Sequence, residues 1–365
     1  MVNRPYTVGL IIPTGIGASV GGYAGDALPV ARALSQVCDR LITHPNVLNG
    51  AQLYWPIANA LYVEGYALDQ FAAGQWGLQP VHQNRIGLLL DAAIEPELRW
   101  RHLQVADAAR ATLGLDLTDY VVTDQPLGVE LRTAPSGATW GTIQAPDSLL
   151  RAAHRLIHDV KADAIAVIAR FPDDPGTEAL ENYRHGQGVD PLAGAEAVIS
   201  HLVVRQFQVP CAHAPALEPL PLDPTLSPKS AAEEIGYTFL PCVLAGLSRA
   251  PQFIDRSQGD RSIVGSASAT TVWRDQLDAF IVPETACGGS ATLHLSQSRT
   301  RIITIRENST RMQAGPRDLG ITTISVQSYL EAIGVIAAHR AGISPAALGP
   351  SILPLQESRS ALQPS

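Results

Sequence analysis

The chain has 365 residues, of which 46% are hydrophobic and 16% are charged. It exceeds the usual domain length of about 100–200 residues, so we expect two closely packed domains or one large one, and the apolar share excludes a largely disordered chain. Lysine and arginine number 26 against 34 aspartates and glutamates, without a basic cluster, which excludes nucleic-acid binding through phosphate neutralisation.

The sequence leads us to expect a cytoplasmic protein with no membrane partner. The first seven residues lead directly into a strand-like run, with no apolar signal region before it. One of the longest apolar stretches, residues 239–247, is far shorter than the roughly 20 residues of a membrane helix. The four cysteines contain no C-x-x-C pair, which favours reduced thiols over a disulfide framework or a zinc ribbon.

Short apolar runs alternate with helical stretches through the first part of the chain. In chain order we predict strand 8–13, helix 27–39, strand 40–43, helix 57–71, strand 86–90, helix 96–113, strand 120–123, helix 148–161 and strand 164–169. This alternation is typical of an α/β fold with mostly parallel, Rossmann-like sheets and helices on both faces.

Two segments interrupt this order. Short runs at 129–132 and 139–143 flank the turn sequence A-P-S-G, which predicts a β-hairpin inserted near 124–144. Residues 206–229 are dense in proline and predict an extended connection between lobes.

The last part of the chain returns to the α/β pattern. Helices resume near residue 230 and continue past residue 247, and the further predictions are strand 279–283, helix 291–297, strand 301–305 and helix 326–338. We therefore expect an N-terminal lobe (1–205), a C-terminal lobe (230–350) packed on it, and a flexible tail (351–365).

The glycine-rich loop at residues 14–26 is the leading candidate for a ligand site. In open parallel sheets, ligands bind beyond the carboxyl ends of the strands. Glycines permit positive φ angles and let backbone N–H groups approach an anion, and the following helix N-terminus adds a partial positive charge. The residues expected to hold a phosphate or carboxylate are Thr14, Gly15, Gly17, Ser19, Gly21 and Gly22. The alternative is a tight turn whose small residues serve packing.

Other loops supply further candidates for ligand binding. A second glycine loop precedes the predicted helix 291–297 and has the same two interpretations. Arg170 lies in a polar loop that can form a lid over an anionic substrate or be a plain surface loop. The ligand-binding candidates outside the first loop are Asn46, Arg170, Gly288, Gly289, Ser290 and Asn308.

Acid, base and nucleophile candidates also follow predicted strands. Histidine and carboxylate side chains suit proton transfer, and Cys287, before two glycines at a helix N-terminus, can act as a nucleophile if its pKa is lowered. The alternatives are structural histidines, helix-capping aspartates and a small buried cysteine. The catalytic candidates are His44, Asp91, Asp124, His213, Glu284, Cys287 and Glu307.

The cofactor question stays open at this level. Gly15, Gly17 and Gly21 approach the nicotinamide fingerprint, but the second strand ends in T-H-P-N, without the acidic residue that binds an adenosine ribose. No phosphate-binding lysine motif and no metal-binding motif appear, so we expect no metal. The cofactor is unknown.

Several stretches together resemble a known family. They are residues 14–26, 41–51, 87–91, 169–174 and 210–215. They are similar to a domain of unknown function, of about this length, found mainly in cyanobacteria and photosynthetic eukaryotes. The resemblance covers most of the chain. It implies a cytoplasmic or plastid setting and supplies no activity or catalytic residues.

The leading hypothesis is a small-molecule metabolic enzyme whose glycine-rich loops hold an anionic substrate, with the reaction left open. The alternatives are a non-catalytic metabolite binder or sensor and a nicotinamide-dependent oxidoreductase. A homodimer is expected only because dimers are the commonest oligomers.

Overall fold

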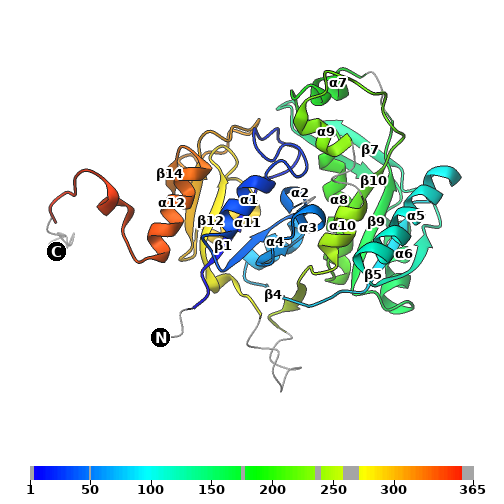
Figure 1. Ribbon diagram of the computed structural model, residues 1–365, viewed down its shortest axis with the longest axis horizontal. Coiled ribbons are helices and arrows are strands. Elements are labelled where there is room, and N and C mark those ends of the chain that lie inside the picture. Colours follow the sequence, from blue (N-terminus) through cyan, green and yellow to red (C-terminus); the bar gives the residue numbers. More distant parts are fainter. Residues whose placement is uncertain (1–3, 49–50, 174–176, 235–239, 258–270, 356–365) are drawn as a thin grey trace, which may run out of the picture.

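The computed structural model describes residues 4–48, 51–173, 177–234, 240–257 and 271–355 (Figure 1). Part of the tail expected at 351–365 therefore lies outside the described residues. The helices are α1 (Leu28–Ser35), α2 (Pro45–Leu48), α3 (Ala51–Tyr54), α4 (Gly65–Ala72), α5 (Pro96–Leu113), α6 (Pro146–His158), α7 (Glu178–Arg184), α8 (Ala193–Phe207), α9 (Pro228–Glu234), α10 (Leu240–Leu247), α11 (Ser290–Leu295) and α12 (Tyr329–Arg340).

A six-stranded parallel sheet forms the first lobe, which we call the Rossmann lobe. Its strands are β1 (Thr7–Leu10), β2 (Arg40–Thr43), β3 (Ala60–Tyr62), β12 (Leu277–Pro283), β13 (Arg301–Ile305) and β14 (Ile324–Val326). They are arranged in the order β14-β13-β12-β1-β2-β3. This is the strand order of a doubly wound α/β sheet, with its switch point between β1 and β12.

A four-stranded parallel sheet forms the second lobe, inserted between β3 and β12 and called the inserted lobe. Its strands are β5 (Ile86–Leu90), β6 (Leu117–Val122), β9 (Ala164–Arg170) and β10 (Cys211–Ala216), in the order β10-β9-β5-β6. Two antiparallel pairs complete the strands: β4 (Trp76–Gln79) with β11 (Gln252–Asp255), and the hairpin β7 (Val129–Thr133) with β8 (Thr139–Ile143).

Alternating strand residues divide the core into two faces, because successive side chains in a strand point to opposite sides. In β2, Leu41 joins the hydrophobic cluster that contains helices α1 and α12, whereas Ile42 joins the cluster that contains α4 and α11. In β5, Leu88 packs with α5, and Leu89 packs with α6 and α8. The predicted α/β class, with parallel sheets covered on both faces, is therefore confirmed.

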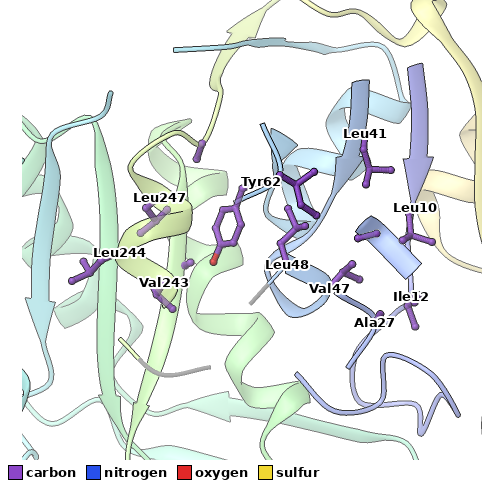
Figure 2. Close-up of a cluster of buried hydrophobic side chains, with 14 of the residues drawn as sticks. Leu10, Ile12, Ala27, Leu41, Val47, Leu48, Tyr62, Val243, Leu244 and Leu247 are labelled. Atoms are coloured by element: carbon purple, nitrogen blue, oxygen red, sulfur yellow. The ribbon is translucent and has the colours of Figure 1, made fainter. Parts of the chain in front are cut away.

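The two lobes share one hydrophobic core, in which α10 packs beside β3. Figure 2 shows Tyr62 of β3 between Leu48 on one side and Val243 and Leu247 of α10 on the other. A Cβ atom on Gly246 would lie 2.5 Å from a ring carbon of Tyr62. Glycine is therefore required at this position of α10, because any side chain would displace the buried ring.

Three elements differ from the sequence-based expectations. The helix predicted at 57–71 begins only at Gly65, because residues 60–62 pair with β2 as strand β3. The proline-dense segment contains the edge strand β10, where Pro215 is tolerated because an edge strand has unpaired backbone groups. Helix α8 was not predicted at all, although its buried Ile199 and Val203 carry a helical spacing.

The two sheets also do not correspond to the two lobes expected at residues 1–205 and 230–350. Strands from both ends of the chain form the Rossmann sheet, because β12 pairs in parallel with β1. The other sheet uses only the middle of the chain. Such long-range pairing has no local signal in the sequence.

Two helical glycines provide a matched test of the packing between the lobes. Gly246→Ala should lower the free energy of unfolding by about 1–3 kcal/mol, because the new methyl group overpacks against Tyr62. The methyl group added by Gly334→Ala in α12 would meet nothing within 4 Å. This substitution should raise the free energy of unfolding by up to about 1 kcal/mol through helix propensity. Chemical denaturation of both variants checks this. Equal effects of the two substitutions would contradict the packing.

Candidate functional site

A large cavity lies between the carboxyl ends of the Rossmann sheet and the inserted lobe. Its volume is about 1310 Å³. On the Rossmann side it is lined by Thr14 after β1, Asn46 after β2, Glu64 after β3 and Ser290 after β12. On the other side it is lined by α8, β10 and the segment after β10. A cavity at the switch point of a doubly wound sheet is the expected place for a ligand.

A histidine–carboxylate pair, in which the carboxylate is buried and the imidazole is partly exposed, forms one part of the cavity wall. Glu64 is 97% buried as a side chain (3% exposed), and it caps α4 by accepting hydrogen bonds from the N–H groups of Tyr66 (2.8 Å) and Ala67 (3.3 Å). Its other oxygen, Oε1, forms an ion pair with Nδ1 of His201 on α8. Neither Oε1 nor Nδ1 has a hydrogen-bond partner elsewhere among the described residues.

The electrostatics of this pair favour a charged histidine. Burial alone would lower the pKa of His201, but the hydrogen bond and charge of Glu64, together with Asp69, outweigh it and raise the pKa above 6.5. The Asp69 carboxylate accepts a hydrogen bond from the N–H of Ala291 at 2.9 Å, and burial raises its pKa. The Glu64 carboxylate therefore stabilises the protonated form of the imidazole.

A second histidine lies farther along the same wall. Nε2 of His213 on β10 is 3.6 Å from Glu196 Oε2, and its Nδ1 is 3.3 Å from the hydroxyl of Ser200. Glu196, Ser200 and His201 all come from α8 and all line the cavity. One helix thus supplies groups to both histidine–carboxylate pairs.

His44 is the third histidine of interest, and its surroundings keep it neutral. The ring is buried, and its Nε2 accepts a hydrogen bond from the N–H of Ile12 at 3.1 Å. Burial lowers its pKa from 6.5 to about 4. Because Nε2 is already an acceptor, only Nδ1 can engage a ligand.

The cavity lining is strongly acidic. Two arginines, Arg101 and Arg132, line it against nine carboxylates: Glu64, Asp69, Asp173, Asp190, Glu196, Glu218, Asp223, Glu233 and Glu234. Burial, and then the charge of Glu196, raises the pKa of Asp190 to about 7. Burial and the charge of Asp190 likewise raise the pKa of Glu233. The raised pKa values favour the protonated forms of Asp190 and Glu233, and Asp173 and Glu234 pair with Arg170 and Arg184, which lie outside the lining. The carboxylates that are ionised favour a cationic ligand over an anionic one.

The glycine-rich loop docks the two lobes onto each other. The Thr139 N–H donates to the Gly15 carbonyl at 2.8 Å, and a Cβ on Gly15, which has φ +70°, would lie 2.8 Å from Thr139 Oγ1. A Cβ atom on Gly17 would similarly lie 2.9 Å from a side-chain carbon of Val189, which belongs to the inserted lobe. Lys229 of α9 donates to the Ser19 carbonyl at 2.6 Å.

Six amides of this loop already have acceptors within the protein. The N–H groups of Ser19, Val20 and Gly21 donate to Ser309 O, Asn308 Oδ1 and Asp26 Oδ1, respectively. Those of Ala24, Gly25 and Asp26 donate to Glu233 Oε1, Asn46 O and Tyr23 O, respectively. An anion would have to displace these acceptors. The packing alternative therefore explains this part of the loop, Gly22 included, whose Cβ would meet the Ala18 carbonyl oxygen at 2.3 Å.

Three of the catalytic candidates, Asp91, Asp124 and Cys287, have surroundings that suit a structural role. Oxygens of the buried Asp91 accept hydrogen bonds from the backbone N–H groups of Ala93, Leu127 and Arg170 at 3.0–3.1 Å. Asp124 is exposed, and its bidentate pair with Arg151 lowers its pKa to about 2. Burial raises the pKa of the Cys287 thiol to about 11, which opposes the expected nucleophile.

The other candidates outside the cavity lining are held by local contacts. Glu284 accepts a hydrogen bond from Ser325 at 3.1 Å, and Glu307 is exposed. Arg170 pairs with Glu95 at 2.9 Å and with Asp173. Asn308 binds Tyr329 at 2.7 Å, and Gly288 does not line the cavity. The candidates that the fold brings together at the cavity are Thr14, His44, Asn46, His213, Gly289 and Ser290.

The other cavity residues that carry titratable side chains were not predicted from the sequence. Glu64 lies within a segment predicted as helix, and His201 and Glu196 lie on a helix that was not predicted. Their spacing on α8 (residues 196, 200 and 201) is compatible with one helical face, which was the available signal. Their partners Glu64 and His213 are distant in sequence, so only the fold pairs them.

One group among the described residues has the spacing of a metal site. Ligand atoms of Glu181, His185 and Asp223 lie within 4.8 Å of one another. Nδ1 of His185 is 2.7 Å from the Glu181 carbonyl, which turns Nε2 toward Asp223 at 3.2 Å. The group lies at the cavity edge, where Asp223 contributes to the lining.

Comparison with known proteins identifies the family. The family model described as "Protein of unknown function (DUF3326)" matches residues 7–349. The chain belongs to this family. The resemblance found in the sequence is thereby confirmed. No solved structure matches the chain.

A relative from Synechococcus sp. is 64% identical over 350 residues, covering 96% of this chain and 95% of that protein, and is named an uncharacterized lipoprotein. That name contradicts the cytoplasmic location expected from the sequence, and we withdraw that expectation. Among the described residues, no helix combines the length and apolarity needed to cross a membrane.

Glu64→Gln tests the cause of the raised pKa of His201. The amide keeps the size of the side chain but removes the negative charge that stabilises the protonated ring. The pKa of His201 measured by NMR titration should therefore fall to 6.5 or below. The exposed control Asp124→Asn should leave it unchanged. An unaltered pKa in Glu64→Gln would rule out this pairing.

His44 should make the fold sensitive to mild acid. The ring binds fewer protons in the folded state than in the unfolded state between pH 6.5 and about 4, so stability falls as the pH decreases through this interval. The loss approaches about 3 kcal/mol for a shift of this size. His44→Gln can still accept the Ile12 hydrogen bond without titrating. Unfolding curves at pH 7 and 4.5 should show a smaller loss in the variant, and equal losses would argue against a neutral buried His44.

Proposed function

We propose that this protein is an enzyme that performs acid–base catalysis on a small molecule bound in the cavity between the lobes. The observation that carries the proposal is the Glu64–His201 pair in the cavity wall. A pocket with only backbone donors would favour a metabolite binder, whereas this one places titratable side chains where a ligand would lie.

The proposed proton-transfer group is Nε2 of His201. Glu64 engages Nδ1, fixes the tautomer and stabilises the protonated ring, which is the role of an orienting carboxylate. Glu64 is itself held by two backbone N–H groups, so the pair is rigid before any ligand binds. Nε2 then accepts a proton from the substrate or returns it.

His213 is proposed as the second acid–base group. Its contact with Glu196 spans 3.6 Å, a separation that one water or a substrate group can bridge. Two histidines with separate carboxylates permit one to act as base while the other acts as acid. Reactions that move a proton between two positions of a substrate suit this arrangement.

Acyl transfer is a less suitable reaction for this site. Ser200, His213 and Glu196 have the connectivity of a hydrolase triad. However, the Ser200 hydroxyl is buried in α8 and donates to the Ala197 carbonyl at 3.3 Å. A nucleophile needs an accessible oxygen at a turn or loop, so we assign Ser200 the role of positioning His213.

The other two sequence-based hypotheses have less support. An anionic substrate would meet an acidic lining and a glycine loop whose amides bind protein acceptors. A nicotinamide cofactor would need a ribose-binding carboxylate directly after β2, where this chain has His44 and Pro45.

The test compares wild-type protein with His201→Asn in a defined metabolite mixture followed by mass spectrometry. Wild-type protein should convert a component that the variant converts about 10²–10⁴-fold more slowly, the usual contribution of a general acid–base group. Asp124→Asn serves as the control and should retain full activity. Conversion at equal rates by His201→Asn would refute the role of His201. Binding detected by thermal shift without any conversion would favour a metabolite binder.

A further inference from the structure

The cavity is larger than a typical metabolite requires, and much of its wall is apolar. Ligand pockets usually measure about 300–1,000 Å³, against about 1310 Å³ here. The segment after β10 contributes Leu217, Leu220 and Leu226 to the wall, and Leu180 of α7 and Leu192 add to it. Half-buried leucines that face a cavity make the binding free energy of a ligand with an apolar body more favourable.

One wall of the cavity holds three carboxylates without a lysine or arginine partner among the described contacts. Asp190 accepts a hydrogen bond from the N–H of Leu192 at 2.8 Å, and Glu196 contacts only the imidazole of His213 as an ion-pair partner. Glu233 accepts hydrogen bonds from the Ala24 N–H and the Tyr183 hydroxyl. Burial disfavours the ionised form of such carboxylates, so each either holds a proton or needs a positive charge beside it.

The missing positive charge is better supplied by an organic cation than by a metal ion. A bound metal needs several ligand atoms within a few ångströms of one another. Across the part of the chain that the structure describes, that spacing occurs at Glu181, His185 and Asp223, which are not the residues of this wall. An ammonium group can instead satisfy carboxylates that lie apart, through its separate N–H donors.

We infer that the cavity binds a bulky amphipathic molecule with an apolar body and a protonated amine head, the head facing Asp190, Glu196 and Glu233. The leucine-rich segment after β10 covers the apolar body. The inference rests on the proposed function only in naming this molecule as the substrate, because binding does not require turnover.

Three probes of equal shape separate charge from size: 2-(1-naphthyl)ethylamine, 2-(1-naphthyl)ethanol and 1-naphthaleneacetate. Calorimetric titration of the full chain at pH 7 should give an affinity for the amine at least about ten-fold higher than for the alcohol. The acetate should bind more weakly than the alcohol. Ethylamine, which lacks the apolar body, should not bind measurably. Equal affinity for amine and acetate, or no binding of any probe, would overturn the inference.

Variants then locate the head group. Glu196→Gln should reduce the affinity for the amine by about ten-fold and leave that for the alcohol unchanged. Asp190→Asn gives an independent second variant if the first fails to fold. Asp124→Asn, which lies outside the cavity lining, should bind all probes as the wild type does. If amine affinity is the same in both cavity variants, the assigned wall is wrong.

The two proposals fail in distinguishable ways. Amine-selective binding that depends on Glu196, without conversion of any metabolite, would support the ligand class and refute catalysis. Conversion of an anionic compound that depends on His201, without amine binding, would support catalysis and refute the ligand class.

Discussion

The hydrophobic packing between the two lobes is the constraint on which the rest of the molecule depends. Helix α10 and Tyr62 of β3 belong to one buried cluster that spans both lobes, and α4 and α8 belong to a second. Gly246 lets the Tyr62 ring lie directly on α10. A shared core holds the lobes at a fixed distance, and that distance creates the cavity.

Helix α8 converts this arrangement into a chemically defined site. The helix packs into the inserted lobe through Ile199 and Val203, and it lines the cavity with Glu196 and His201. Their partners are His213, within β10 of the inserted lobe, and Glu64, just after β3 of the Rossmann lobe. The pairs are therefore held in place by the same core that joins the lobes.

The glycine-rich loop shows that one sequence pattern can also contribute to packing between lobes. Its position after β1 is that of a phosphate-binding loop. Its carbonyl and amide groups, however, bind Thr139, Lys229 and Glu233 of the inserted lobe. The small residues permit this close contact, so the loop helps to hold the two lobes together.

The sequence by itself determined the α/β class, the strand–helix alternation and the family, because apolar periodicity and local motifs carry that information. Strand 86–90 and helix 96–113 needed only local signals and were predicted to the residue. Six of the candidate site residues also reached the cavity, since residues after parallel strands gather at one edge.

Only the tertiary structure decided which strands share a sheet and which side chains meet. Pairing β12 with β1, and His201 with Glu64, joins residues far apart in the chain, and no local pattern specifies such partners. The charge of the cavity was equally hidden, because carboxylates that look solvated in sequence are gathered there by the packing of two lobes around one core.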